Sequence, residues 1–198
     1  MPFTPSHVAA VLPLLRTPLP ASALVAGSIA PDVPYYLPVL LGLPTHSALA
    51  VVTTDVVLGA LAWLLWHALV AAPALAAAPA PLRARLSGRV ELGVVRRVDS
   101  AQRVIALVLG LVVGAATHVG WDEFSHEGRW GTEHISQLGA DWYGLAGYRW
   151  VQYASAVLGG AVLAGWLARW WRRTRPVPVP PAPVPRWIWL APPAAGLV

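Results

Sequence analysis

Two histidines and an aspartate recur at four-residue intervals near the end of a long apolar run, as His118, Asp122 and His126. Four residues turn an α-helix by about 400°, only ~40° beyond a full turn, so the three side chains share one helix face. Imidazoles and a carboxylate are costly to bury in apolar surroundings without a partner. A divalent metal ion would satisfy all three, so metal-dependent chemistry is the first prediction.

The spacing leaves two arrangements open. On a continuous helix His118 and His126 lie about 12 Å apart along the axis, too far to bind one ion. Asp122 could then bridge two ions about 3.5–4 Å apart, each taking one histidine. Alternatively, the helix breaks after Phe124, near Gly128, and His126 folds back. Two-metal sites activate water against phosphoesters and acyl groups, so hydrolysis is the expected reaction class.

The residue types restrict the metal. The chain has no cysteine, which excludes thiolate ligands and disulfides. Ligands must come from His, Asp, Glu or backbone oxygen, a set that suits zinc, manganese, magnesium or calcium. We expect zinc, as one or two ions. Glu123 and His134 are candidates for general base or acid; alternatively, they are solvated loop charges.

The composition is that of an integral membrane protein. Hydrophobic residues make up 57% and charged residues 12%, against about 25% charged in soluble domains, and the mean hydropathy is +0.58. Three stretches reach the roughly 20 apolar residues that span a bilayer: Ala48 to Ala72, Val104 to about Phe124, and Trp150 to Trp171. We therefore predict an all-α helical bundle with three to four transmembrane helices.

The ends of the chain differ from these spans. Prolines interrupt the apolar residues 1–45, which favours short helices packed on the bundle, one of them over Ala21 to Ala30. Residues 1–175 should form a single membrane-embedded domain and residues 176–185 a proline-rich linker. The apolar residues 186–198, about 13 in number, are too few to span. They either lie in the interface or begin a longer segment.

Charge asymmetry predicts the orientation. All 14 positive residues are arginines, and they cluster in the loop Pro73 to Arg103 and in the segment Arg169 to Arg175. These should be cytoplasmic, whereas the acidic loop Trp121 to Arg149 should face outward. The net charge of +5 then reflects topology, and no nucleic-acid partner is expected. The absence of lysine indicates a GC-rich, bacterial genome, so we expect a multi-pass protein of the bacterial inner membrane.

This topology places His46 on the same outer side as the His118 motif, and His7 and Asp32 as well unless the N-terminal region crosses the membrane. Each has a plainer interpretation. His7 could be a surface residue, Asp32 after Pro31 could be a turn or N-cap residue, and His46 could cap the first span. Together they make an outward-facing metal site plausible on sequence grounds.

Four motifs in order resemble the bacterial family of unknown function DUF4184, and the likeness extends to Tyr148–Tyr153. The motifs are residues 1–7, Gly27–Asp32, Thr45–Ser47 and His118–His126. More distantly, the pattern is similar to the membrane-bound metal-dependent hydrolase family and to zinc-dependent phospholipase C. That wider resemblance implies six metal ligands: His7, Asp32, His46, His118, Asp122 and His126.

Other polar residues lie within the apolar stretches. Asp55 could hydrogen-bond a ligand histidine from outside the coordination shell; alternatively, it pairs with Thr53, Thr54 or a backbone group. Gln152 could line the site, and we expect His67 to be structural.

We therefore expect a membrane-embedded, metal-dependent hydrolase of ester or phosphoester substrates, lipid-like because the site lies at headgroup depth. The bilayer and this substrate are the expected partners. One alternative is a non-catalytic membrane protein in which a metal or polar network stabilises the bundle. A metal transporter, suggested by Asp55 and His67, ranks last, because these residues differ by about 120° around the helix.

Overall fold

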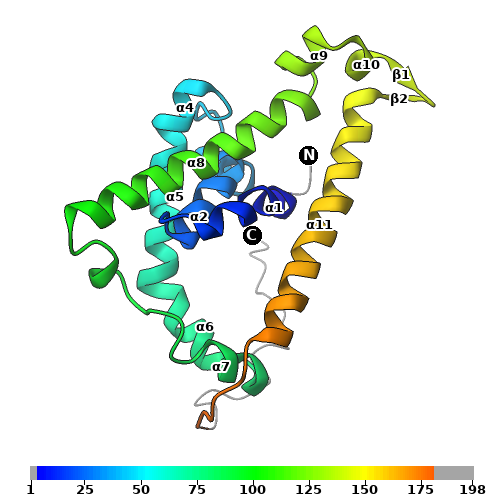
Figure 1. Ribbon diagram of the computed structural model, residues 1–198. Helices are drawn as coiled ribbons and strands as arrows, with labels where there is room; N and C mark the ends of the chain where they lie inside the picture. Colours follow the sequence, from blue (N-terminus) through cyan, green and yellow to red (C-terminus); the bar gives the residue numbers. More distant parts are fainter. Residues whose placement is uncertain (1–3, 181–198) are drawn as a thin grey trace.

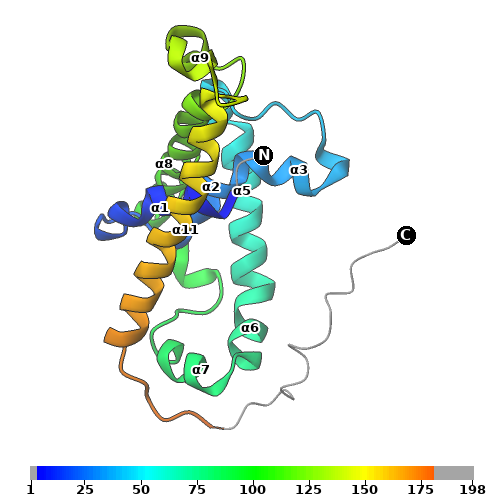
Figure 2. The same ribbon diagram turned by 90° about the vertical axis from the view of Figure 1, so that its right-hand side faces the viewer.

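The computed structural model describes residues 4–180, which form a helical bundle with a single small hairpin (Figures 1 and 2). Three helices are long and apolar enough to cross a membrane: Thr54–Ala77, Ala101–His134 and Gly147–Arg173. The predicted all-α fold with three spans is therefore confirmed. The apolar tail predicted at 186–198, and residues 181–185 of the linker, lie outside the described residues.

The N-terminal region is a series of short helices, as its prolines predict. In order they are η1 (Thr4–His7), α1 (Val8–Val11), η2 (Leu12–Arg16), α2 (Ala21–Ile29), η3 (Ala30–Asp32), α3 (Val33–Tyr36) and η4 (Pro38–Leu40). The longest, α2, has the bounds expected from the sequence to within one residue.

The first span is built from several helical pieces. Helix α4 (Ala48–Val52) is separated from α5 (Thr54–Leu65) by Thr53, whose φ of −125° and ψ of −93° are not helical. The first span continues from α5 through a π-helical turn, η5 (Trp66–Val70), into α6 (Ala71–Ala77). The break at Thr53 moves the continuous span toward the C-terminus of the predicted Ala48–Ala72.

The other two spans, α8 (Ala101–Ser125) and α11 (Gly147–Arg173), extend a few residues beyond the predicted stretches. Short elements connect the spans at the two ends of the bundle (Figure 1). At one end lie α7 (Ala80–Leu86) and η6 (Val95–Arg97), and at the other α9 (Trp130–His134), α10 (Ser136–Gly139) and the antiparallel strands β1 (Asp141–Trp142) and β2 (Leu145–Ala146).

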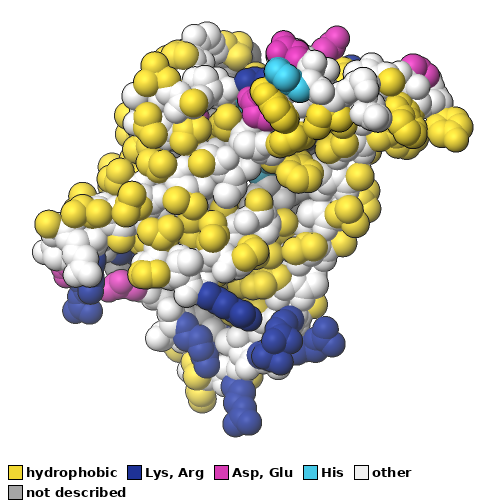
Figure 3. Space-filling view, turned by 45° about the horizontal axis from the view of Figure 1, so that its top comes forward, with side chains coloured by type: hydrophobic (Ala, Val, Ile, Leu, Met, Phe, Trp, Pro, Cys, Tyr) yellow, Lys and Arg dark blue, Asp and Glu magenta, His cyan; other side chains and the backbone are white. Residues whose placement is uncertain are grey.

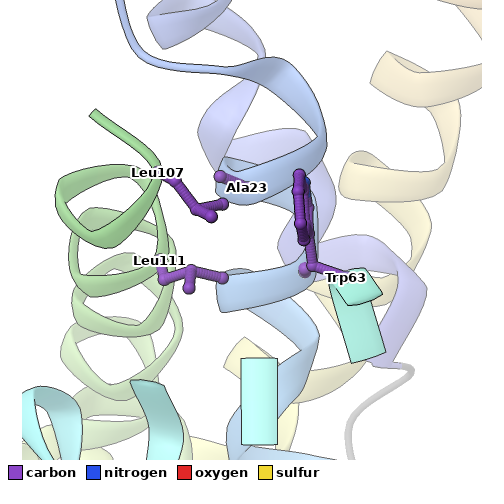
Figure 4. Close-up of a cluster of buried hydrophobic side chains, with 5 residues drawn as sticks. Ala23, Trp63, Leu107 and Leu111 are labelled. Atoms are coloured by element: carbon purple, nitrogen blue, oxygen red, sulfur yellow. The ribbon is translucent and has the colours of Figure 1, made fainter. Parts of the chain in front are cut away.

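Helix α2 lies between α5 and α8, and buried side chains fill the space. Ala23 of α2 packs among Trp63 of α5 and two leucines of α8, Leu107 and Leu111 (Figure 4). The Trp63 indole N–H also donates a hydrogen bond to the Ser22 hydroxyl at 3.0 Å. This packing fixes α2, and with it η3, against the two neighbouring spans.

Small residues let α2 and α8 approach at backbone distance. A Cβ on Gly27 would lie 2.2 Å from the Leu111 carbonyl oxygen, and a Cβ on Gly114 would lie 2.3 Å from the Leu24 carbonyl oxygen. Gly110 and Gly114 are four residues apart on α8, the spacing at which small residues bring membrane helices together. The close contact brings the C-terminal end of α2 against the segment of α8 that carries His118.

Helix α11 packs on η1 and α1 and on the C-terminal part of α8. A Cβ on Gly159 would lie 2.8 Å from Ser6 Cβ, so the two elements touch directly. Between α11 and Pro180 the chain forms no helix or strand, and the Val177 N–H donates to the Ala84 carbonyl at 2.8 Å. The proline-rich segment therefore returns to α7 instead of projecting away from the bundle.

Candidate metal centre

The six residues implied by the sequence lie together, although they come from separate elements. His7 ends η1, Asp32 ends η3 and His46 precedes α4. His118 and Asp122 lie on α8, and His126 follows its last residue. Five of the six are buried, and the His126 side chain is 29% exposed. The short N-terminal helices thus bring His7 and Asp32, and the segment before α4 brings His46, to one face of α8.

Four of these side chains are in close contact, because each of two histidines lies near both aspartates. His46 Nε2 lies 3.2 Å from Asp32 Oδ1 and 3.4 Å from Asp122 Oδ2. His118 Nε2 lies 3.5 Å from Asp32 Oδ1 and 3.4 Å from Asp122 Oδ2. Ligands about 2.1 Å from a tetrahedral zinc ion lie about 3.4 Å from one another. The four nitrogen–oxygen separations are close to this value, so neighbouring His and Asp side chains of this set could share one ion.

A second group shares the other oxygen of Asp122. His126 Nδ1 lies 3.3 Å and His7 Nε2 lies 3.7 Å from Asp122 Oδ1. His7, His118 and Asp122 also offer ligand atoms within 4.8 Å of one another, as do Asp32, His46 and His118. The buried His and Asp groups could therefore hold a metal ion, and the two oxygens of Asp122 face different histidines.

The end of α8 has the broken-helix arrangement, one of the two considered from the sequence. The helix stops at Ser125, and His126 has extended backbone, with φ −130° and ψ 148°. His126 therefore turns back toward Asp122, as a broken helix requires. His118 and His126 still meet opposite oxygens of Asp122, as a bridging carboxylate requires.

Backbone contact fixes the ring orientation of His118. Its Nδ1 donates a hydrogen bond to the Ser28 carbonyl at 2.7 Å, because a carbonyl can only accept. Nε2 is then left unprotonated in the neutral ring, as metal binding requires. The Nε2 atoms of His7 and His118 are buried and have no hydrogen-bond partner in the part of the chain that the structure describes. Such atoms fit a site that surrounds a cation.

His46 has an unusual backbone conformation. Its φ is +60°, in the left-handed region that residues other than glycine rarely occupy. The Arg129 guanidinium donates to the His46 carbonyl at 2.7 Å, and the Thr45 hydroxyl lies 2.9 Å from His46 Nδ1. These contacts hold the ring with Nε2 toward the two aspartates.

The electrostatic setting of Asp32 favours its ionised form. Burial alone would raise the pKa of Asp32, but the nearby histidines His118 and His46 and the Thr4 hydroxyl outweigh burial and hold that pKa below its ordinary value. Thr4 donates its hydroxyl proton to Asp32 Oδ2, and the Tyr36 hydroxyl lies 2.8 Å from Thr4 Oγ1. Asp32 is therefore a carboxylate at neutral pH.

His7 remains neutral. Its ring stacks on that of His118, with centroids 3.9 Å apart. Burial, followed by repulsion from His118, lowers the pKa of His7 from 6.5 to about 4. An imidazole must be unprotonated to bind a metal, so His7 has the required state well below pH 7.

The two residues predicted for acid–base chemistry lie apart from this group. Glu123 accepts a hydrogen bond from the Trp130 N–H at 3.0 Å and pairs with Arg129 at 3.5 Å. His134 is exposed, stacks on the Trp130 ring and lies 2.8 Å from the Trp130 carbonyl. Among the described contacts, neither touches any of the six residues. Both instead organise the loop that follows α8.

Of the residues expected around the site, Asp55 comes from the neighbouring span α5. It is fully buried, and neither of its carboxylate oxygens has a hydrogen-bond partner in the described chain, so the predicted bond to a ligand histidine is not seen. The Gln152 side chain, on α11, likewise makes no described hydrogen bond to the six residues. His67 is buried on η5, beside Trp63.

The contacts that orient the candidate metal ligands were not predicted from the sequence. The Ser28 carbonyl is a backbone atom, which leaves no signal in residue type. Thr4 and Thr45 carried a weak signal, because each stands in a motif that also contains a candidate ligand. Arg129 lies in the acidic loop and, from charge patterning alone, reads as a solvated residue.

No curated protein and no solved structure matches the chain. Its whole length, residues 1–198, matches a family model described as "Domain of unknown function (DUF4184)". The motifs that carry the site's side chains are those on which the resemblance to this family rests. The chain belongs to the DUF4184 family.

Proposed function

We propose that this membrane protein is a metal-dependent hydrolase of ester or phosphoester substrates, and that the substrates are lipid-like. The observation that carries the proposal is the set of four nitrogen–oxygen distances of 3.2 to 3.5 Å that His46 and His118 each make to Asp32 and Asp122. Buried carboxylates and imidazoles at such distances require a compensating charge. A zinc ion would supply it.

The two groups would have different roles. Asp32, His46, His118 and Asp122 would hold one ion with four protein ligands, the number typical of structural zinc sites. His7, Asp122 and His126 offer only three, which leaves a position open, as in catalytic sites. A bound divalent ion supplies Lewis acidity and makes water a stronger nucleophile near neutral pH.

The protein's own groups prepare this chemistry. His7 stays neutral and Asp32 ionised at pH 7, so both are ready to bind. Burial of five of the six side chains excludes bulk water, and the partial exposure of His126 marks the open side. In hydrolysis, the hydroxyl of water joins phosphorus or the acyl carbon, and the proton goes to the departing oxygen.

The charge distribution supports an orientation for the site. Arginines gather at the end of the bundle formed by α7 and the end of α11, whereas acidic side chains gather around α9 and α10 (Figure 3). The positive-inside rule then puts the α7 end in the cytoplasm. The six residues would lie toward the outer leaflet of the bacterial inner membrane.

Elemental analysis tests the metal centre. Protein purified in detergent should carry one or two equivalents of zinc, and H118A/D122A should carry less than a tenth of that amount. H134A is the matched control, because His134 is exposed and outside the six, and it should retain the metal. Equal metal content in wild type and double variant would overturn the metal site.

One observation favours a second candidate, a structural metal centre without catalysis. The group around Asp32 provides four protein ligands and is buried, as in closed structural sites. A panel of aryl esters, phosphomonoesters and phosphodiesters separates the two functions. Turnover that disappears with chelation and returns with zinc supports the hydrolase, whereas metal-dependent thermal stability without turnover supports the structural centre.

A further inference from the structure

An apolar cavity of about 410 Å³ lies beside the metal-binding group. Ser6, His7 and Ala9 of η1 and α1 form one wall, and residues of α11 between Val151 and Val162 form the opposite wall, with Trp121 of α8 at the side. The volume falls within the range of small-molecule sites in proteins. His7 belongs both to this cavity wall and to the six residues of the candidate metal centre.

The cavity is lined almost entirely by hydrocarbon. On α11 the wall includes Ala154, Leu158 and Val162, and Ser155 of the same wall directs its hydroxyl proton to the Gln152 carbonyl at 2.9 Å. These residues belong to the third candidate span, Gly147–Arg173. The cavity therefore lies along a helix that is long and apolar enough to cross a membrane.

We infer that this cavity holds one acyl chain of the substrate, so that the ester or phosphoester group lies at His7. The inference rests on the proposed hydrolase function and specifies its substrate as a chain-bearing lipid. Such a molecule would enter sideways from the bilayer, alongside α11, without leaving its hydrocarbon surroundings. Its polar group would meet the partly exposed His126 side of the centre.

The lining favours a lipid chain over a peptide. Backbone amides must find hydrogen-bond partners away from water, and walls made of aliphatic side chains do not provide them. A hydrocarbon chain has no such requirement. A second apolar cavity, of about 630 Å³, lies on the other side of α1, but none of the six residues lines it. Of these two cavities, the one beside His7 connects a chain to the proposed chemistry.

Photo-crosslinking tests occupancy without depending on turnover. The protein is placed in nanodiscs of phosphatidylethanolamine and phosphatidylglycerol, with a trace of phosphatidylethanolamine that carries a diazirine in one acyl chain. Labelling of the α11 segment from Val151 to Val162 should be saturable and competed by unlabelled lipid. A154F, which fills the cavity, should lower this labelling at least fivefold, whereas A164F should not.

Ala164 is a suitable control because it is also an exposed alanine on α11 and lines neither cavity. H118A/D122A should label like the wild type, because chain binding does not need the metal. Labelling that is unsaturable, or equal in A154F and A164F, would show only surrounding lipid and would overturn the acyl-chain site.

Kinetics then separate the two proposals. A154F should reduce hydrolysis of a long-chain phospholipid at least tenfold and leave that of a water-soluble aryl phosphoester within twofold. Equal loss on both substrates would refute the chain-binding role. If the wild type hydrolyses neither substrate but shows saturable labelling, the hydrolase proposal fails while the cavity still binds a chain.

Discussion

The Nδ1 atom of His118 lies 2.7 Å from the carbonyl oxygen of Ser28, although the two residues are 90 positions apart in the chain. Ser28 follows Gly27, whose missing side chain lets α2 touch the Leu111 backbone. The orientation of a candidate metal ligand thus depends on how closely two helices pack.

Enlarging Gly114 should therefore damage the site from a distance. In G114V the new Cβ would meet the Leu24 carbonyl and push α2 away from α8. We expect a loss of about 1–3 kcal/mol in stability, typical of overpacking, and less than half of the wild-type zinc content. Thermal unfolding and elemental analysis measure the two effects.

The control for that variant is G120A, on the same helix, where a Cβ would meet nothing within 4 Å. It should retain its metal. If G114V also binds a full complement of zinc, the Ser28 contact is not needed to orient His118.

Single substitutions should change metal stoichiometry in a graded way. D122N weakens both groups, because Oδ1 and Oδ2 of Asp122 face different histidines, and should remove both ions. H126A disturbs only the group around Oδ1, so one equivalent should remain. Native mass spectrometry counts the ions, and loss of every ion from H126A would point to a single shared site.

Acid should destabilise the metal-free protein through His7. In the unfolded chain His7 takes up a proton near pH 6.5, whereas in the folded protein it does so near pH 4. Between these values the unfolded state binds more protons, so stability falls as pH is lowered from 6.5 to 4. The loss reaches about 3 kcal/mol.

Thermal unfolding of chelator-treated protein across this pH range measures the loss. In H7Q the slope should be clearly shallower, because glutamine does not titrate. Parallel curves for the two proteins would assign the acid sensitivity to other groups.

Arg129 and Glu123 should affect metal binding indirectly, by positioning His46. R129A frees the carbonyl of His46, which has the left-handed backbone, and should weaken zinc binding about 10- to 100-fold, as loss of groups supporting a metal ligand does. R149A is the control, since Arg149 lies over the Tyr148 ring instead. Competition with a zinc-binding dye measures both affinities.

The substitution E123Q separates positioning from catalysis. If Glu123 only anchors Arg129 and the Trp130 N–H, E123Q should keep the pH profile of hydrolysis and change turnover less than fivefold. Disappearance of one limb of the pH profile would instead identify Glu123 as the acid or base predicted from the sequence.

The long helices could be predicted because length and hydropathy determine them. The grouping of six side chains was expected from charge asymmetry and resemblance. Helix spacing put His118 beside Asp122, whereas His126 reaches Asp122 from beyond the helix end at Ser125. The break at Thr53 could not be foreseen, since threonines fit within a helix. The Ser28 and His46 carbonyl contacts involve backbone atoms, which residue types do not encode.

The α2–α8 contact also bears on the order of assembly. Three of the six side chains precede residue 50 and three follow residue 115, so the centre cannot form before α8 has been synthesised and inserted. Until then the N-terminal helices lack the surface that receives Gly27. Metal uptake would thus report completed insertion of the second span, because the ion would bind side chains from the first 46 residues together with side chains at the end of α8.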